Sequence, residues 1–163
     1  MSKILSPEQL ASLADEWRRR DLKTVLTNGC FDLLHAGHLH LFRTAKRCGD
    51  LLIVGINSDH TVKILKGEHR PYCTERDRLE LVSALETVDY VVLFDELTAD
   101  RLIQIVRPRI YVKGGDYSME NLPERVTAAK MQCRIVFVPL KLGNSTTRLA
   151  ERIRAANGSG PLL

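Results

Sequence analysis

The chain has 163 residues, a length that suits one domain with its own hydrophobic core. Hydrophobic residues make up 44% and charged residues 27%, as in ordinary soluble globular proteins. The net charge of +4 favours anionic partners: nucleotides, sugar phosphates or nucleic acid. The basic residues are spread along the chain, and the run WRRR at 17–20 is typical of a solvated helix end. We therefore expect no nucleic-acid partner.

The cysteines and the apolar runs indicate the compartment. No run approaches the roughly 18 apolar residues that a membrane span needs, and no apolar signal segment opens the chain. The cysteines form no C-x-x-C pair, which argues against a structural zinc site. They lie far apart, at Cys30, Cys48, Cys73 and Cys133. We expect a reduced, cytoplasmic protein with no membrane partner.

The first predicted element is an amphipathic helix within residues 1–22. Ser6 is a suitable N-cap, Pro7 suits the first helical position, and Gln9 completes a capping box. Leu10 and Trp17 fall on one face of this helix.

Apolar runs and segments of helical period then alternate. The runs that predict strands lie at 23–28, 50–57, 89–94, 109–115 and 133–140. The segments that predict helices lie at 38–48, 75–88, 98–108, 122–132 and 145–157. This alternation predicts a Rossmann-like, doubly wound α/β fold: a five-stranded parallel sheet with helices on both faces. We expect one domain over 23–156 and a flexible tail over 157–163.

Three of the five histidines lie within six residues, at His35, His38 and His40, between the first predicted strand and its helix. A metal site, a phosphate site and histidines that only cap or cover the helix are the alternatives. His40 lies inside the helix, and no acidic or cysteine partner has metal-site spacing, so the metal site is disfavoured.

The turn around these histidines favours phosphate. In a doubly wound sheet, ligands bind at the carboxyl ends of the strands, where this turn lies. Gly29 permits a sharp turn, and Gly37 lets a ligand atom approach the backbone. The following helix directs free N–H groups and its positive end to the same place, and two imidazoles there can donate hydrogen bonds to phosphate oxygens.

The segment GCFDLLHAGH resembles the G-x-F-D-x-x-H-x-G-H signature of the cytidylyltransferase-like nucleotidyltransferases. The resemblance extends over 23–153. The segments VGINSDHTVKILKGEHRPY, RLELVSALETVDYVV, YVKGGDY and GNSTTRLAERI are most similar to the adenylyltransferase domain of bacterial ADP-heptose synthesis. That resemblance implies transfer of AMP from ATP to D-glycero-β-D-manno-heptose 1-phosphate, with release of pyrophosphate. It also implies Mg²⁺, held through the triphosphate and by no identified protein ligand.

Site residues follow from the resemblance together with the position of polar groups. The expected catalytic residues are His35, His38 and Lys66. The expected nucleotide-binding residues are Gly29, Cys30, Phe31, Gly37, His38, Gly115, Asp116, Asn144, Ser145, Thr146, Thr147 and Arg148, although Cys30 fills a variable position and is given no chemistry. The expected acceptor-binding residues are Asp32, Asn57, Ser58, Asp59 and Arg78.

Several of these positions have simpler explanations. Ser145 and Thr146 suit an ordinary N-cap as well as a triphosphate site. Lys63 and Lys66 are expected on a loop after the second predicted strand, where lysines are usually only solvated. Asp116 suits a turn as well as a ribose, a base or a magnesium-bound water.

Three other functions are weighed against this one. A glycerol-3-phosphate-type cytidylyltransferase shares the signature, a nucleotide-binding regulator shares the fold, and a nucleic-acid-binding protein would explain the charge. Many relatives carry a sugar kinase ahead of this domain, and we expect that kinase to be a separate protein here. The oligomeric state stays open between a monomer and a homodimer.

Overall fold

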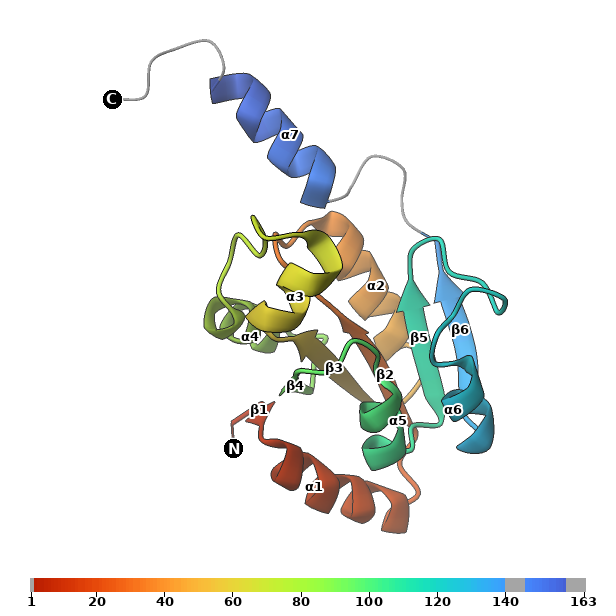
Figure 1. Ribbon diagram of the computed structural model, residues 1–163. Helices are drawn as coiled ribbons and strands as arrows, with labels where there is room; N and C mark the ends of the chain where they lie inside the picture. Colours follow the sequence, from red (N-terminus) through yellow and green to blue (C-terminus); the bar gives the residue numbers. More distant parts are fainter. Residues whose placement is uncertain (1, 140–145, 158–163) are drawn as a thin grey trace.

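The computed structural model describes residues 2–139 and 146–157, which form a three-layer α/β domain (Figure 1). All pairings in the sheet are parallel, and the strand order is β1-β4-β3-β2-β5-β6. The strands are β1 (Ile4–Leu5), β2 (Thr24–Gly29), β3 (Leu51–Asn57), β4 (Tyr90–Phe94), β5 (Ile110–Gly114) and β6 (Arg134–Val138). The helices are α1 (Pro7–Arg19), α2 (Ala36–Lys46), α3 (Asp59–Lys66), α4 (Glu75–Ser83), α5 (Asp100–Val106), α6 (Arg125–Lys130) and α7 (Thr146–Asn157).

The prediction of five strands is wrong by one, since the sheet has six. The five predicted strands are present, and the additional strand is β1, which pairs with β4 at the edge of the sheet. Ile4 aligns with Val91, and the Val91 N–H donates a hydrogen bond to the Lys3 carbonyl oxygen. A strand of two residues is too short to show a period of two in the sequence, so the pattern gave no sign of it.

Helix α1 begins as the sequence predicts. The Ser6 hydroxyl accepts a hydrogen bond from the Gln9 N–H, and the Gln9 side chain accepts one from the Ser6 N–H. Leu10 and Trp17 are buried, and the Trp17 ring lies 5.0 Å from the Tyr90 ring of β4. The capping box therefore starts a helix whose apolar face covers the edge of the sheet that β1 extends.

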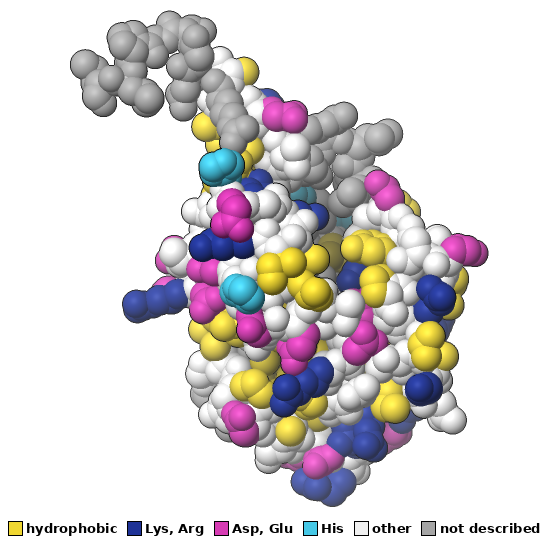
Figure 2. All heavy atoms as spheres, viewed as in Figure 1, with side chains coloured by type: hydrophobic (Ala, Val, Ile, Leu, Met, Phe, Trp, Pro, Cys, Tyr) yellow, Lys and Arg dark blue, Asp and Glu magenta, His cyan; other side chains and the backbone are white. Residues whose placement is uncertain are grey.

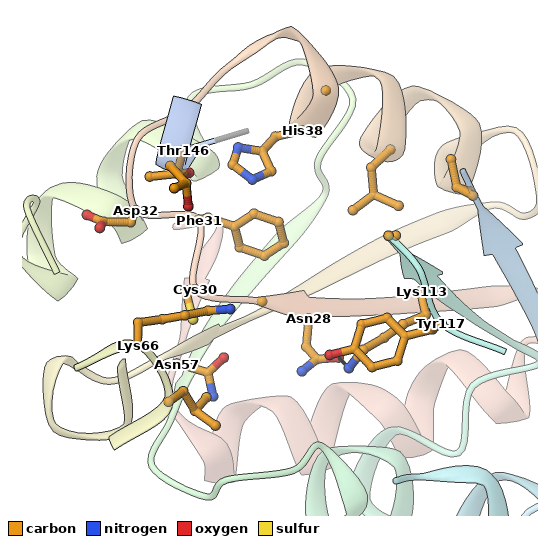
Figure 3. Close-up of a pocket in the computed structure, with 18 of the residues that line it drawn as sticks. Asn28, Cys30, Phe31, Asp32, His38, Asn57, Lys66, Lys113, Tyr117 and Thr146 are labelled. Atoms are coloured by element: carbon orange, nitrogen blue, oxygen red, sulfur yellow. Dashed lines mark hydrogen bonds between the residues drawn. The ribbon is translucent and has the colours of Figure 1, made fainter. Parts of the chain in front are cut away.

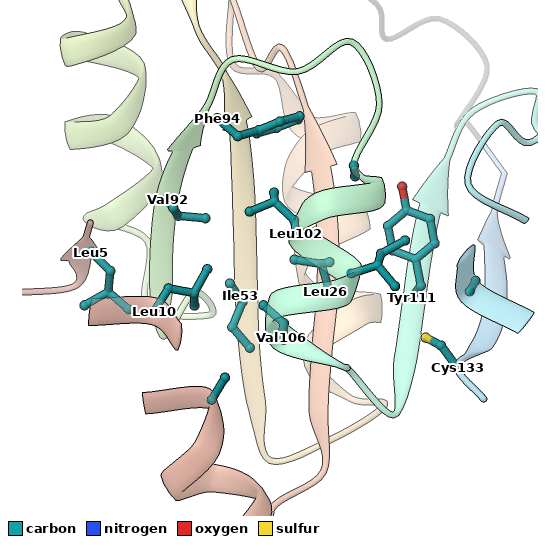
Figure 4. Packing of buried hydrophobic residues seen from close by; sticks show 14 of the residues in the cluster. Leu5, Leu10, Leu26, Ile53, Val92, Phe94, Leu102, Val106, Tyr111 and Cys133 are labelled. Carbon is teal, nitrogen blue, oxygen red and sulfur yellow. The ribbon is translucent and has the colours of Figure 1, made fainter. Parts of the chain in front are cut away.

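Apolar clusters on the two faces of the sheet hold the layers together. One cluster joins α1, α5 and α6 to residues such as Leu26, Ile53 and Tyr111 (Figure 4). The other joins α2 and α4 to residues such as Val25 and Val54. Adjacent strand residues thus point into opposite layers, which gives the continuous apolar runs seen in the sequence.

The segment after β3 is a helix, which corrects the prediction of a loop around Lys63 and Lys66. The Ser58 side chain caps α3 by accepting a hydrogen bond from the Thr61 N–H. Gly67 ends the helix with φ of 100°, a conformation that favours glycine. Because α3 has only eight residues, its helical period was hard to separate from a turn.

The order of the strands places a switch point beside β2. The chain passes from β2 to β3 and β4 on one side, and then returns to form β5 and β6 on the other side. Connections that diverge in this way leave a crevice at the carboxyl ends of β2 and β5. No helix within residues 2–139 and 146–157 is long and apolar enough to cross a membrane. Of the tail predicted at 157–163, Asn157 is the last residue of α7, and 158–163 lie outside the described residues.

Candidate active site

A cavity of about 440 Å³ opens at this switch point (Figure 2). The ends of β2 and β5 form its base, and residues from α2, α3 and α7 surround it. Exposed apolar side chains stand at its mouth, among them Leu65, Leu97 and Tyr117. The lining combines charged and polar groups with apolar surface, which suits a ligand that has both charged and flat or apolar parts.

The turn between β2 and α2 forms one side of the cavity. Phe31 has φ of 46°, which is uncommon for an aromatic residue, and its side chain is buried. Its ring lies 5.0 Å from the Phe42 ring and meets the His38 ring edge-on at 5.2 Å. A Cβ at Gly29 would lie 3.1 Å from the Phe31 ring, a tighter contact than side chains usually make. This packing fixes the course of the turn and thereby the direction of His38.

The two signature histidines stack on each other at this turn. Their ring centroids are 3.7 Å apart, and the ring planes differ by 20°. His35 is also the N-cap of α2, because its Nδ1 accepts a hydrogen bond from the Gly37 N–H at 3.1 Å. A neutral imidazole that accepts at Nδ1 carries its proton on Nε2, so Nε2 of His35 remains available as a donor.

The surroundings favour neutral forms of both histidines. Burial, together with the nearby His35, lowers the pKa of His38 to about 4. Burial also lowers the pKa of His35. Nδ1 of His38 is buried and has no hydrogen-bond partner among the described residues. Two neutral imidazoles beside a helix N-terminus thus face the cavity before any anion is bound.

Helix α7 brings a second N-terminus to the same side. Thr146 and Thr147 line the cavity, and the Thr146 hydroxyl donates a hydrogen bond to the Leu33 carbonyl oxygen at 3.3 Å. Figure 3 shows Thr146 beside His38, across from Asn28 and Tyr117. We call this side the histidine wall; it comprises His35, Gly37, His38, Thr146 and Thr147. Of the other predicted residues here, Asn144 and Ser145 lie outside the described residues, as does the side chain of Arg148.

Asp32, predicted to bind the acceptor, lines the cavity but is fully engaged by protein groups. One carboxylate oxygen accepts hydrogen bonds from the Tyr72 and Cys73 N–H groups, at 2.7 and 2.9 Å. The other lies 2.8 Å from the Arg70 guanidinium. The Asp32 side chain is 1% exposed. It therefore ties the segment after α3 to the β2–α2 turn.

The other predicted acceptor residues divide between the cavity and the interior. Asn57 lines the cavity, and its amide donates to the Glu96 carbonyl at 3.3 Å. Ser58 caps α3 and pairs with the Asp95 carboxylate. Ser58, Asp59 and Arg78 do not contribute to the lining of the described cavity.

Arg78 is fully buried behind the cavity. Its guanidinium donates hydrogen bonds to the carbonyl oxygens of Cys30 at 2.6 Å and Asn57 at 2.7 Å. It also donates to the Cys73 carbonyl at 3.2 Å and pairs with the Asp59 carboxylate at 2.8 Å. These contacts join the ends of β2 and β3, so Arg78 supports the shape of the site from within.

Lys66 approaches the cavity from the opposite side. It is the last residue of α3, is exposed, and reaches past Cys30 into the cavity (Figure 3). Gly115 also lines the cavity, with φ of 115°, whereas the neighbouring Asp116 is exposed and does not line it. The Asp116 carbonyl accepts a hydrogen bond from the Asn121 side chain, as in an ordinary turn.

Three polar residues at the base of the cavity, two of them buried and Asn28 half-buried, were not predicted. Lys113 lies 3.3 Å from Glu124, and its ammonium donates hydrogen bonds to the Asn28 side-chain oxygen and the Tyr111 hydroxyl, each at 3.2 Å. Burial lowers the pKa of Lys113, while the Glu124 carboxylate opposes that shift. We call Asn28, Lys113 and Glu124 the polar floor.

Among the described residues, no group of three His, Cys, Asp or Glu side chains is arranged to hold a metal ion. Asp32 has both oxygens engaged, and Glu124 is paired with Lys113. The arrangement therefore fits a cation that arrives with a polyphosphate and takes most of its ligands from phosphate oxygens and water, as Mg²⁺ does.

The sequence model of the cytidylyltransferase-like family matches residues 26–152, which is most of the chain. The chain belongs to the cytidylyltransferase-like family. This confirms the family that the signature around His35 and His38 predicts. The match begins in β2 and ends in α7, so it includes both helix N-termini of the histidine wall.

Relatives of this cytidylyltransferase-like chain include two proteins named Bifunctional protein HldE. The one from Wolinella succinogenes is 44% identical over 94% of this chain, and the one from Syntrophotalea carbinolica is 45% identical over 93%. The chain spans about a third of the length of these relatives, 32% and 31% respectively.

Two solved structures share the fold. A lipopolysaccharide core biosynthesis protein from Thermoplasma volcanium is 27% identical, with a TM-score of 0.58, over 74% of this chain and 97% of that one. A pantoate-beta-alanine ligase from Francisella tularensis has a TM-score of 0.66 over 97% of this chain and 77% of that one. The ligase is only 14% identical, so its similarity shows the fold alone.

The polar floor lies outside the signature of the cytidylyltransferase-like family, yet the sequence held one sign of it. Lys113 interrupts an otherwise apolar strand just before two glycines, and a lysine inside a buried strand is rare without a partner. In the sequence pattern, Asn28 is only the last residue of a predicted strand, and Glu124 is only one residue of a predicted helix. Nothing in the sequence linked the three positions.

Proposed function

We propose that this chain transfers AMP from ATP to D-glycero-β-D-manno-heptose 1-phosphate, producing ADP-heptose and pyrophosphate. Membership of the cytidylyltransferase-like family supports nucleotidyl transfer. The choice of substrates rests on the segments that resemble the adenylyltransferase domain of ADP-heptose synthesis. It is supported by the Thermoplasma relative, which is a lipopolysaccharide core biosynthesis protein. ATP is made and used in the cytoplasm, where we place the reaction.

The stacked pair of His35 and His38 is the observation that carries this proposal. An oxygen of the sugar phosphate attacks the α-phosphorus of ATP, forming a new P–O bond. The bond from that phosphorus to the bridging oxygen breaks, and pyrophosphate leaves with the electron pair. The attacking group is already an anion at neutral pH, so no base has to remove a proton. Catalysis then consists of positioning the two phosphates and stabilising charge on the α-phosphoryl oxygens.

Each side of the cavity has a part in this step. The histidine wall donates hydrogen bonds to the triphosphate from the two imidazoles and from the N-terminus of α7, and the positive end of α2 attracts the same charge. Lys66, from the opposite side, neutralises charge on the α-phosphate or the acceptor phosphate. Mg²⁺, when bound with ATP, neutralises charge on the triphosphate. A sugar kinase would have to supply the sugar 1-phosphate.

The test is pyrophosphate release by the purified protein with matched pairs of substrates. We expect kcat/KM for heptose 1-phosphate with ATP to exceed that for glycerol 3-phosphate with CTP by on the order of 10³, because several hydroxyl contacts distinguish the acceptors. Crossed pairs, heptose 1-phosphate with CTP and glycerol 3-phosphate with ATP, separate the choice of base from the choice of acceptor. A preference for the CTP pair would assign the chain to glycerol-phosphate cytidylyl transfer instead.

A further inference from the structure

The polar floor holds charges in a place where charge is costly. The side chains of Lys113 and Glu124 are only 9% and 2% exposed, and their ion pair spans 3.3 Å. Taking two such charges out of water is costly, and an apolar pair of similar volume is often as stable. A buried ion pair at the base of a cavity is therefore a candidate for ligand recognition.

The hydrogen bonds of Lys113 leave it little capacity for a phosphate. An ammonium has three N–H groups, and those of Lys113 already have three acceptors: Asn28, Tyr111 and Glu124. Its charge is matched by the Glu124 carboxylate at 3.3 Å. The polar floor as a whole is thus close to neutral, which suits a neutral polar ligand better than an anion.

Glu124 and Asn28 retain groups that a ligand can use. Oε1 of Glu124 accepts from the Ala99 N–H at 3.0 Å and from Lys113, but its Oε2 is buried without a partner among the described residues. Because lysine only donates, the Asn28 atom that faces Lys113 must be the oxygen, which turns the Asn28 NH₂ group away from it. Both residues line the cavity. Together they offer a free acceptor and a free donor, the complement of a hydroxyl group.

The position of the polar floor matches the far end of a ligand held by its phosphate. In Figure 3, Asn28, Lys113 and Tyr117 lie across the cavity from His38 and Thr146. The Tyr117 ring, 40% exposed, stands 4.9 Å from the Lys113 ammonium and provides an apolar surface beside these polar groups. A flat apolar face next to fixed hydrogen-bonding groups suits the C–H face and hydroxyls of a sugar ring.

We propose that the polar floor is the subsite that recognises the hydroxyl groups of the acceptor sugar, with Glu124 accepting from one hydroxyl and the Asn28 amide donating to the same or a neighbouring one. This inference rests on the proposed function. The ribose of the nucleotide offers the same chemistry. We assign the acceptor because, of the five residues expected to bind it, only Asn57 lines the cavity without being fully engaged, while Asp32, Ser58, Asp59 and Arg78 are held by protein groups.

The experiment compares Glu124→Gln with the wild type for two acceptors and for ATP. Glutamine keeps an oxygen for the Ala99 N–H but removes the charge and replaces one acceptor by a donor. We expect kcat/KM for heptose 1-phosphate to fall by about 10- to 100-fold, mainly through KM, as for loss of one hydrogen bond to a buried charged group. We expect kcat/KM for glycerol 3-phosphate to change less than about threefold, because this acceptor is too small to span the cavity. The Kd of an ATP analogue should also change less than about threefold. Glu120→Gln, in an exposed part of the same loop, is the matched control.

Each alternative gives a different result. An equal fall in kcat/KM with both acceptors would mean that Glu124 acts only on structure. A higher Kd of the ATP analogue would assign the polar floor to the ribose. Either result overturns the proposal. If Glu124→Gln does not fold, the double variant Lys113→Gln/Glu124→Gln replaces it. The double variant leaves no buried charge unpaired.

Direct calorimetric titration with heptose 1-phosphate, in the presence of a non-hydrolysable ATP analogue, keeps this test independent of turnover. Wild-type protein that binds the sugar phosphate through Glu124 but does not convert it would refute the proposed function and retain the subsite. Equal affinity of the wild type and Glu124→Gln would refute the subsite whatever the activity.

Discussion

The two sides of the cavity are built in opposite ways. The histidine wall is largely local in sequence, because its imidazoles and the N–H groups of α2 come from one turn. The polar floor joins side chains from β2, β5 and the residue before α6, and they bond chiefly to one another. Short segments with helix N-termini recognise phosphate, which every substrate of such an enzyme carries. Distant side chains fixed by a network recognise a particular arrangement of hydroxyls.

This contrast gives each side a separate role that experiments can test. A change in the histidine wall should slow the reaction with every acceptor to the same extent. A change in the polar floor should alter the preference among acceptors. A change in a residue behind the cavity, such as Arg78, should lower the stability of the fold. It should alter neither the relative rates with different acceptors nor the preference among them.

The largest effect is expected from removal of the metal. We expect EDTA to abolish pyrophosphate release, magnesium to restore it, and zinc to fail, because no group of metal-ligating side chains is present in the described part of the chain. Both acceptors should respond alike, since the cation would accompany the triphosphate at the histidine wall. Full activity of the metal-free protein would contradict this prediction.

Substitution of Arg78 by Met should lower the free energy of unfolding by about 3–5 kcal/mol, because it leaves buried carbonyls and the Asp59 carboxylate without their partner. Urea denaturation measures the change. Arg76→Met, at an exposed position of the same helix, is the control. An unchanged stability together with a raised KM for the sugar phosphate would instead support the acceptor-binding role expected from the sequence.

Substitution of His38 by Ala should lower kcat by at least about 10²-fold, as for loss of one donor to the transition state. The factor should be the same for heptose 1-phosphate and glycerol 3-phosphate, unlike that of Glu124→Gln. His40→Ala is the matched control, since His40 lies on the same helix but does not line the cavity. Turnover near that of the wild type would exclude the phosphate role of His38.

The sequence was sufficient for features that local pattern determines. The five main strands, the capping box at Ser6 and the turn at His35 all depend on neighbouring residues, so their signals are contiguous. Strand β1 and helix α3 were missed because they are short and are stabilised by tertiary partners or a single cap.

The acceptor side depends on contacts that no local pattern encodes. Ser58, Asp59 and Arg78 have the residue types of a sugar site and follow a strand, but they satisfy one another and the backbone. Glu124 lies far from Asn28 in the sequence, and only the pairing of β2 with β5 and the return of the chain before α6 bring them together.

The smallest effect concerns protons at the histidine wall. An unfolded histidine titrates near 6.5, whereas burial lowers the pKa of His38 in the folded protein to about 4. Between these values the unfolded chain binds more protons than the folded protein. The free energy of unfolding contributed by His38 is therefore fully present above pH 6.5 and is lost progressively as the pH falls toward 4.

We therefore expect the free energy of unfolding to fall more steeply between pH 6.5 and 4 in the wild type than in His38→Gln, which has no titrating group there. Carboxylates also titrate in this range, so the informative quantity is the difference between the two slopes, measured by urea denaturation without ligand. His40→Gln controls for loss of a histidine outside the cavity. Saturation with a non-hydrolysable ATP analogue should reduce the difference, because a phosphate beside His38 favours the imidazolium and raises its pKa. Equal slopes for the wild type and His38→Gln would show that His38 is not held neutral, and would remove the electrostatic distinction between the two sides of the cavity.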